Sequence, residues 1–237
     1  MNIIIHRGTH QIGGSVIEIS TASTRIVLDF GNELSLDEKY TSINLDINGV
    51  TRGIPDCDGI VISHYHMDHL GQLTSALPEI PLYMGELSKE IAIISAEYQD
   101  KDLYLRLLGA NTFRGGEAFT IGNIHIRPLV IDHSAADSYM FVIEAEGKRV
   151  LYTGDFRMHG LRHHILEKLV NTYIGEVDVL ITEGTSLSRD ADECISEAAV
   201  LEDISSYIQD GKYVFVMCSS TNIDRIMGIW QNMPTDK

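Results

Sequence analysis

The chain has 237 residues, 44% of them hydrophobic, which is enough for one sizeable domain with a filled core, or for one domain and part of a second. It has 34 acidic against 18 basic residues, and a surface with a net charge of −16 repels nucleic acid at long range. This charge argues against a broad nucleic-acid-binding face, but bound divalent cations would invert the charge inside one small pocket. No apolar run approaches the roughly 18 residues of a membrane span, and no cleavage signal follows the N-terminus. Three scattered cysteines fit reduced thiols, so we expect a cytoplasmic protein.

Apolar runs separated by turn signals open the chain and predict strands. The runs lie at residues 3–5, 16–19 and 25–30. The pair Gly13-Gly14 predicts a tight turn between the first two strands, and the polar stretch 31–55 predicts a long loop. A short apolar run at 59–62 predicts a buried strand, followed by a helix that extends to Leu77.

The segment directly after this strand has four potential metal ligands within six residues: His64, His66, Asp68 and His69. His64 and His66 are two residues apart, so in an extended segment they point to the same side. Asp68 and His69 follow where the chain turns into the predicted helix. Imidazole suits zinc and similar ions, and an added carboxylate suits a hydrolytic site. A histidine-rich surface loop is the alternative, and this spacing at a strand-to-helix junction disfavours it.

The middle of the chain predicts first a strand and a helix, and then a set of antiparallel strands. Residues 81–84 predict the strand, and apolar residues from Leu87 to Tyr98 define one face of a long helix. The period then changes to two, which predicts a meander with Glu146-Gly147 as one of its turns. The strands of the meander lie at residues 121–129, 139–143 and 149–152.

The last third of the chain predicts two different kinds of unit. A helix at 161–173 and a buried strand at 177–182 complete a series in which strands and helices recur in two similar halves. This series predicts an α+β fold, a sheet sandwich flanked by helices. The rest of the chain predicts the opening of another α/β unit. Its expected elements are a helix at 198–208, a strand at 213–217, and a capping box at 221–224 from which a second helix continues.

Two later strand ends supply further candidate ligands. His133 ends one apolar run and Asp155 follows another, and loops at strand ends commonly hold reactive groups on a rigid scaffold. A carboxylate such as Asp155 can bridge two cations about 3.5–4 Å apart. Taken alone, each residue would be an ordinary turn residue, but the segment at 64–69 favours the ligand role. Asp29 also ends a strand, and the sequence leaves open whether it orients the histidine loop or is a turn aspartate.

Together these residues resemble the metallo-β-lactamase fold hydrolases over about residues 1–183. The resemblance consists of His64-x-His66-x-Asp68-His69, His133, Gly154-Asp155-Phe156 and the upstream Asp29. Three stretches are similar to the β-CASP nucleases, the ribonuclease J-like branch: 133–138, 182–185 and 215–225. Ala136 and Gly184 depart from the pattern of that branch, in which proline and serine are usual at these places.

The resemblance implies a metallo-β-lactamase αββα sandwich domain at 1–185 and the incomplete start of an inserted α/β β-CASP-like domain at 186–237. It also implies two divalent metal ions, zinc or alternatively manganese. The first ion would be held by His64, His66, His133 and a bridging Asp155. The second would be held by Asp68, His69 and Asp155. Two further histidines of the family lie beyond the last residue here, so we expect a truncated chain with a weakly occupied second site and low activity.

The implied activity is that of a phosphodiesterase, most directly a ribonuclease, in which the metal centre activates a water molecule. Asp68 and Glu183 are the implied catalytic residues, and Glu183 would support proton delivery to the leaving oxygen. Six residues are candidates for contact with the substrate: Ser134, Asp137, Ser138, Ser219, Ser220 and Asn222. The last three are equally well explained as caps of the helix that follows.

Two other functions stay open. One is a thioester or small-ester hydrolase of the glyoxalase II-like type. The other is a catalytically incomplete binding or partner subunit, with which the acidic surface is consistent. The expected partner is RNA or another phosphodiester, no membrane is expected, and the sequence leaves the oligomeric state open.

Overall fold

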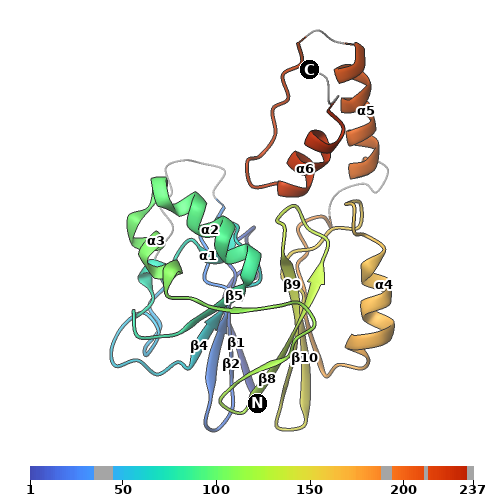
Figure 1. Ribbon diagram of the computed structural model, residues 1–237. Coiled ribbons are helices and arrows are strands. Elements are labelled where there is room, and N and C mark those ends of the chain that lie inside the picture. The colour runs from blue at the N-terminus through green and yellow to red at the C-terminus, as the bar shows by residue number, and fades with distance from the viewer. Residues whose placement is uncertain (35–44, 188–193, 211–212, 234–237) are drawn as a thin grey trace.

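Two β-sheets packed face to face form the centre of the computed structural model, and helices cover the outer face of each sheet (Figure 1). The structure describes residues 1–34, 45–187, 194–210 and 213–233. The α+β sandwich expected from the alternation of strands and helices is therefore confirmed.

The first sheet has six strands in the order β1-β2-β3-β4-β5-β6. They are β1 (Asn2–Arg7), β2 (Val16–Ser20), β3 (Arg25–Leu28), β4 (Gly59–Val61), β5 (Leu82–Gly85) and β6 (Asn111–Phe113). The strands β1 to β3 are antiparallel, whereas β3 to β6 pair in parallel. Parallel pairing places the carboxyl ends of β3 to β6 at one edge, where ligand-binding loops gather in α/β sheets. The histidine segment begins at this edge.

The second sheet has five strands in the order β11-β10-β9-β8-β7. They are β7 (Phe119–Ile121), β8 (Ile124–Ile131), β9 (Ser138–Ala145), β10 (Lys148–Tyr152) and β11 (Val179–Ile181). The turn between β9 and β10 has positive φ angles at Glu146 (51°) and Gly147 (68°), as a type I′ hairpin requires, so the predicted turn is confirmed. Fully buried side chains such as Ile19, Leu28 and Phe141 fill the space between the sheets.

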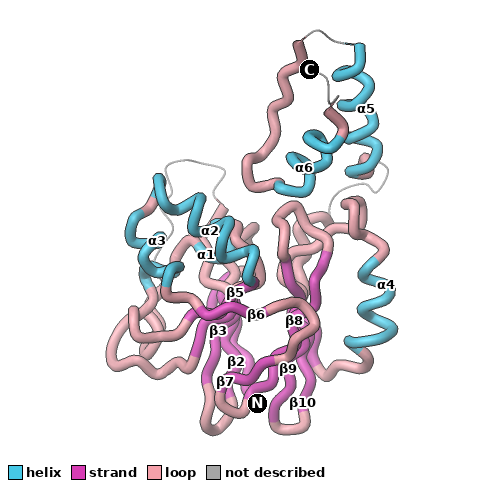
Figure 2. Tube along the Cα trace, viewed as in Figure 1, coloured by secondary structure: helices cyan, strands magenta, loops and turns pink. Residues whose placement is uncertain are grey.

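Helices cover the outer faces of the sandwich. They are α1 (Met67–Leu70), α2 (Glu86–Gln99), α3 (Lys101–Leu108), α4 (Ile165–Leu169), α5 (Glu197–Asp210) and α6 (Ile223–Gln231). A 3-10 turn (Leu73–Ser75) follows α1 and a π-helical turn (Val170–Ile174) follows α4. Figure 2 shows α1 to α3 on the first sheet, α4 on the second, and α5 and α6 beyond the end of the sandwich at which the carboxyl ends of β4 and β5 lie. None of the helices in the described ranges is both long and apolar enough to cross a membrane.

The helix expected to extend from the histidine segment to Leu77 is much shorter, because tertiary hydrogen bonds interrupt it. The backbone N–H of Phe30 donates to the carbonyl of His69 (2.7 Å), and the N–H of Gln72 donates to the carbonyl of Phe30 (2.9 Å). These bonds take the partners that the next helical turn would need. The segment after β3 thus fixes the backbone of the histidine segment directly.

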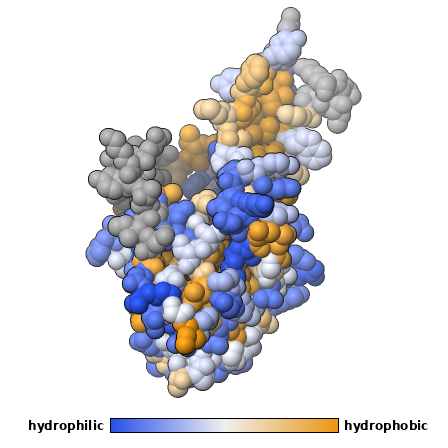
Figure 3. All heavy atoms as spheres, turned by 90° about the vertical axis from the view of Figure 1, so that its left-hand side faces the viewer, coloured by the Kyte–Doolittle hydropathy of each residue, from blue (hydrophilic) through white to orange (hydrophobic). Residues whose placement is uncertain are grey.

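Two strand predictions were wrong: the strand predicted as buried at 177–182 is exposed, and the strand predicted at 213–217 is absent from the described structure. The strand β11 lies at an edge and pairs only with β10, so Val179 and Leu180 are 38% and 56% exposed. Residues 213–217 are extended but have no strand partner among the described residues, and Phe215 and Met217 are 97% and 100% exposed. Figure 3 shows apolar side chains gathered on this upper part of the molecule.

The other helical predictions need smaller corrections. The apolar face that marked α2 points largely to solvent, with Ile94 and Tyr98 exposed, while the small residues Ala92 and Ala96 pack against the sheet. The helix expected at 161–173 begins at Ile165. Neither α3 nor β6 was expected, because each is short, although α3 is amphipathic and buries Leu103 and Leu107 on one face.

We predict that the buried carboxylate of Glu18 stabilises the fold in a pH-dependent way. Burial alone would raise the pKa of Glu18, but hydrogen bonds from Arg25 (2.7 Å) and His6 (2.9 Å) outweigh it and lower that pKa. The stabilisation is then complete above the unfolded pKa, about 4.3, and is lost as the pH falls through the lowered folded pKa. Replacement of Glu18 by Gln should lower the free energy of unfolding by about 1–3 kcal/mol at pH 7. Urea unfolding of both proteins should show this difference shrinking below pH 4, and a difference that stays constant would contradict the prediction.

Candidate metal centre

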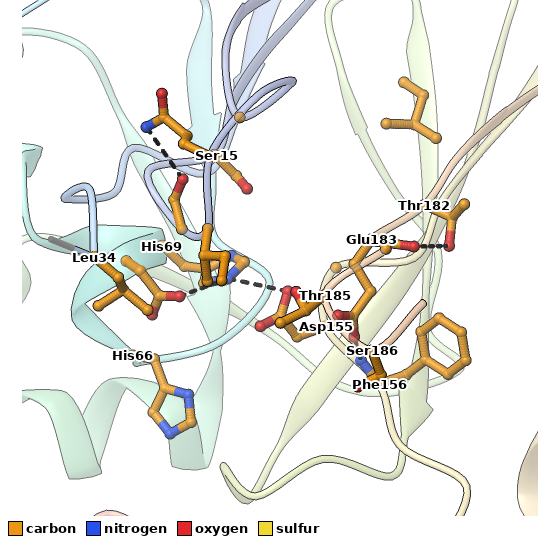
Figure 4. Close-up of a pocket in the computed structure, with 18 of the residues that line it drawn as sticks. Ser15, Leu34, His66, His69, Asp155, Phe156, Thr182, Glu183, Thr185 and Ser186 are labelled. Carbon is orange, nitrogen blue, oxygen red and sulfur yellow. Dashed lines mark hydrogen bonds and ion pairs between the residues drawn. The ribbon is translucent and has the colours of Figure 1, made fainter. Parts of the chain in front are cut away.

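Three loops at the carboxyl ends of β4, β8 and β10 meet at one end of the sandwich. The loop after β4 contributes His64, His66, Asp68 and His69, the loop after β8 contributes His133, and the loop after β10 contributes Asp155. Figure 4 shows His69 and Asp155 pointing toward each other across the pocket between the two sheets. The structure therefore brings together ligand candidates that are far apart in the sequence.

Three imidazoles form the first group of donor atoms. The Nδ1 atom of His66 lies 3.2 Å from Nε2 of His64 and 3.2 Å from Nε2 of His133. All three donor atoms lie within 4.8 Å of one another. A tetrahedral zinc ion with Zn–N bonds of about 2.0–2.1 Å has N···N edges of about 3.3 Å, which these spacings match.

A second group of donor atoms includes the carboxylate of Asp155. Its Oδ1 atom is 3.2 Å from Nε2 of His69, and its Oδ2 atom is 4.0 Å from Nε2 of His133. Asp155 thus faces both groups, as a bridging ligand would. The second group consists of His64, His69 and Asp155, so it shares His64 with the first group, whereas the expected set had Asp68 in place of His64. The Oδ2 atom of Asp68 lies 3.7 Å from Nε2 of His69.

Burial keeps the imidazoles of the first group neutral. It is the main cause that lowers the pKa of His64, His66 and His133, the last to about 3, and neighbouring imidazoles lower these pKa values further. A metal-binding histidine must be neutral, so these side chains are already in the protonation state that a cation needs. The hydroxyl of Ser63 donates to Asp29, so Nδ1 of His64 donates to Ser63 (3.0 Å) and Nε2 presents its lone pair to the group.

Asp29 fixes the histidine loop through hydrogen bonds. It is fully buried and accepts hydrogen bonds from the backbone N–H of Ser63 (2.7 Å), Nδ1 of His69 (2.8 Å) and the hydroxyl of Tyr152. Burial alone would lower the pKa of His69, but the carboxylates of Asp29 and Asp155 outweigh it and raise that pKa well above its usual value. The two carboxylates therefore favour a cation at His69, and a metal ion bound there would displace the proton. Ligating histidines usually donate their other N–H to a carboxylate in this way, so the residues present fit a bound metal.

Comparison with known families agrees with this geometry. The model of a family described as "Beta-lactamase superfamily domain" matches residues 24–204. The chain belongs to this superfamily. Its two sheets and flanking helices form the metallo-β-lactamase fold.

Several curated proteins of similar sequence have names of ribonucleases. The chain is 26% identical to an RNase J-like protein of Methanocaldococcus jannaschii, over 89% of this chain and 49% of the relative. It is 24% identical to ribonuclease J of Helicobacter pylori, over 92% of this chain and 33% of the relative. The chain thus spans about half the length of the first relative and a third of the second.

A solved structure shares the whole fold. It is a protein of unknown function from Enterococcus faecalis V583, 20% identical, which superimposes with a TM-score of 0.77 over 98% of this chain and 63% of that protein. At this identity the likeness supports the fold alone.

A cavity of about 970 Å³ opens beside the donor atoms of this superfamily member. Glu183 and the hydroxyls of Thr185 and Ser186 line it together with the ligand candidates His66 and Asp155. Burial is the main cause that raises the pKa of Glu183, whose carboxylate accepts the backbone N–H of Phe156 (2.8 Å). Glu183 therefore lies at the site, as expected from the sequence.

Of the six candidates for substrate contact, Ser134 lines this cavity and the other five do not. Asp137 instead caps α2, because it accepts the backbone N–H of Ser88 (2.9 Å) and the hydroxyl of Tyr139. Ser138 is buried and donates to the carbonyl of Ala135 (2.9 Å). The remaining three, Ser219, Ser220 and Asn222, lie in the turn before α6, where Asn222 accepts the backbone N–H of Arg225 (3.2 Å). The capping explanation therefore holds for Asn222.

Tyr65, between the first two histidines, has a role that the sequence did not indicate. Its hydroxyl accepts the backbone N–H of Ala136 (2.9 Å) and donates to the carbonyl of Thr221 (2.7 Å). It therefore joins two ligand loops to the turn before α6. Its place between His64 and His66 was the one available signal, since an aromatic ring there must be buried when both imidazoles face the site.

We predict that the Asp29→Asn variant binds zinc about 10- to 100-fold more weakly than the wild type. The amide would present a donor to groups that already donate, namely His69 Nδ1 and the Tyr152 hydroxyl. Chelator competition measures the affinity. Asp178→Asn removes an exposed carboxylate that pairs with Lys148, and it should keep the wild-type affinity as the matched control. Equal affinities of Asp29→Asn and wild type would refute an orienting role for Asp29.

Proposed function

We propose that this chain provides the metal centre of a phosphodiesterase that hydrolyses RNA. The observation that supports the proposal is the position of Asp155 next to two overlapping donor groups: one of its carboxylate oxygens faces His69 and the other faces His133. Two-metal centres with a shared carboxylate suit the hydrolysis of phosphodiesters. The ribonuclease names of the relatives support RNA as the substrate class. The less specific conclusion, that the chain belongs to a hydrolase, is already supported by its membership of the superfamily.

The donor set favours zinc. Imidazoles dominate it, and zinc is commonly bound by histidine and carboxylate ligands, whereas manganese prefers oxygen. Divalent ions bound here would supply Lewis acidity, which activates a water molecule at neutral pH and neutralises charge that develops on the phosphate.

The side chains of the chain itself supply position and proton control. Asp29 fixes the tautomer of His69 by accepting a hydrogen bond from its Nδ1–H, which leaves Nε2 directed at the metal centre. Asp68 approaches His69 because Gly13 has no side chain: a Cβ there would lie 2.7 Å from Cβ of Asp68, and its φ of +73° also favours glycine. Glu183, held by the N–H of Phe156, lies where it can support proton delivery to a leaving oxygen.

The domain division belongs to the same proposal. We assign residues 1–185 to the metallo-β-lactamase domain and 186–237 to the start of a β-CASP-like segment. The stretch that matches the family model ends at residue 204, within α5, so the assigned boundary lies before the end of that match.

The proposal predicts zinc-dependent cleavage of RNA by the full chain. Purified protein loaded with zinc should cleave an end-labelled single-stranded RNA, and removal of zinc by a chelator should abolish the cleavage. The Asp155→Asn variant should lose at least about 100-fold in rate, because it removes the carboxylate that faces both His69 and His133.

A thioester of glutathione serves as the competing substrate. Hydrolysis of the thioester without cleavage of RNA would overturn the proposal in favour of a small-ester hydrolase. Absence of bound metal after zinc loading, measured by elemental analysis, would overturn the metal centre itself. Glu79→Gln is a suitable control, because this carboxylate lies in the loop before β5, outside the donor groups, and the variant should keep the wild-type rate.

A further inference from the structure

Behind the metal centre, two arginines and two carboxylates form a continuous set of ion pairs: Asp132, Arg157, Glu197 and Arg225. A separate ion pair, Arg162 with Asp224, lies beside them, and the backbone N–H of Arg162 donates to Asp132. Asp132 and Glu197 are 0% and 1% exposed, so two of these charges are removed from water. Buried carboxylates are tolerated only where cations and hydrogen-bond donors surround them.

Arg157 joins the two loops that hold His133 and Asp155. Asp132 directly precedes His133, and Arg157 follows Asp155 by two residues. The Nε atom of Arg157 donates to Oδ1 of Asp132 (2.9 Å), and its backbone N–H donates to the carbonyl of Asp132 (2.8 Å). One residue of the second loop thus binds both the side chain and the backbone of the residue before a ligand in the first loop.

The turn after Arg157 closes tightly on the same carboxylate. The backbone N–H of Arg162 donates to Oδ2 of Asp132 (2.6 Å). A Cβ at Gly160 would collide with both Oδ1 of Asp132 and Nε of Arg157, so glycine is needed for this approach. There is little free space in which the loop could shift while the ion pair persists.

The C-terminal helices reach Arg157 through Glu197, the first residue of α5. The carboxylate of Glu197 accepts from Nη1 of Arg157 (3.3 Å), and its backbone N–H donates to the carbonyl of His159 (2.8 Å). Arg225 of α6 holds the same carboxylate with two hydrogen bonds, of 2.6 and 2.9 Å. The guanidinium of Arg157 is therefore placed between one carboxylate of the ligand loops and one of the helices.

We propose that Arg157 is a positioning residue of the metal centre, which sets the spacing of the His133 and Asp155 loops and is itself held by Glu197 of α5. The inference rests on the proposed metal centre. A planar guanidinium can donate to two carboxylates in a fixed geometry, which a lysine ammonium cannot reproduce. Without Arg157, Asp132 would lose its cation while still buried, and the loop next to His133 would have to move toward water.

The test measures zinc affinity by chelator competition, together with thermal unfolding, on the full chain. The Arg157→Gln variant should bind zinc about 10-fold or more weakly than the wild type, as removal of a group that orients ligands does. Arg157→Lys should give an intermediate affinity, because it keeps the charge without the planar fork. Glu197→Gln should weaken binding less, and the double variant no more than Arg157→Gln alone, because Glu197 acts through Arg157.

The control is another ion pair with a buried carboxylate, at the far end of the sandwich. Arg25, at the start of β3, pairs with the buried Glu18. Arg25→Gln should lower the unfolding temperature and leave the zinc affinity at the wild-type value. A structural loss alone would lower the unfolding temperature of both variants and change neither affinity.

Two results would overturn the inference while the proposed function stands. One is a folded Arg157→Gln variant with wild-type zinc affinity, and the other is an equal loss of affinity in Arg25→Gln. If Arg157→Gln does not fold, wild-type affinity in Arg157→Lys would overturn it instead. A wild-type protein that binds no zinc would overturn the proposed function and this inference together, so the two failures are distinguishable.

Discussion

The two sheets are tied together at the metal centre by one buried carboxylate, that of Asp29. It follows β3 of the first sheet, and it accepts hydrogen bonds from Ser63 and His69 after β4 and from Tyr152 at the end of β10 in the second sheet. A carboxylate with no exposed surface would be costly without such donors, so the donors must stay in place for the fold to persist. This constraint joins the stability of the sandwich to the orientation of His69. The ligand geometry is therefore a consequence of satisfying a buried charge.

The candidate ligands could be found in the sequence because each follows a strand that has a clear apolar pattern, and whether they bind a metal stays a prediction. His64, His133 and Asp155 all lie within a few residues of a strand end, and strand ends are where local pattern and chemistry coincide. The sequence did not predict the residues behind them. Asp132 and Arg157 meet only because β8 and β10 both flank β9 in the sheet, a fact about strand order that local periodicity does not contain.

The wrong predictions share one physical cause: the environment of a segment or side chain depends on neighbours that are distant in the sequence. The apolar run at 213–217 has the composition of a strand, yet a strand needs a partner ladder, and the described residues provide none. The sequence predicted that α2 would pack through its large apolar residues, but the helix packs through Ala92 and Ala96, which lie close to the sheet because they are small. Asp137 resembled a substrate-binding residue, but its carboxylate caps α2, whose start is placed beside it only by the fold.

The charge of the chain bears directly on how it would bind a polyanion. Among the residues that the structure describes, two arginines line the cavity beside the donor atoms, and both are bound within the protein: Arg7 donates to the backbone carbonyl of Gly14, and Arg157 pairs with Asp132 and Glu197. With a net charge of −16, the surrounding surface would repel a phosphate backbone rather than attract it. On the proposed function, the attraction for the scissile phosphate must then come mainly from the bound cations, assisted by hydroxyls such as that of Ser134. Loading with metal would thus govern substrate binding as well as the chemical step. Because the guanidinium of Arg157 is paired with Asp132 and Glu197, it would act on the phosphate only indirectly, by positioning the loops that hold His133 and Asp155.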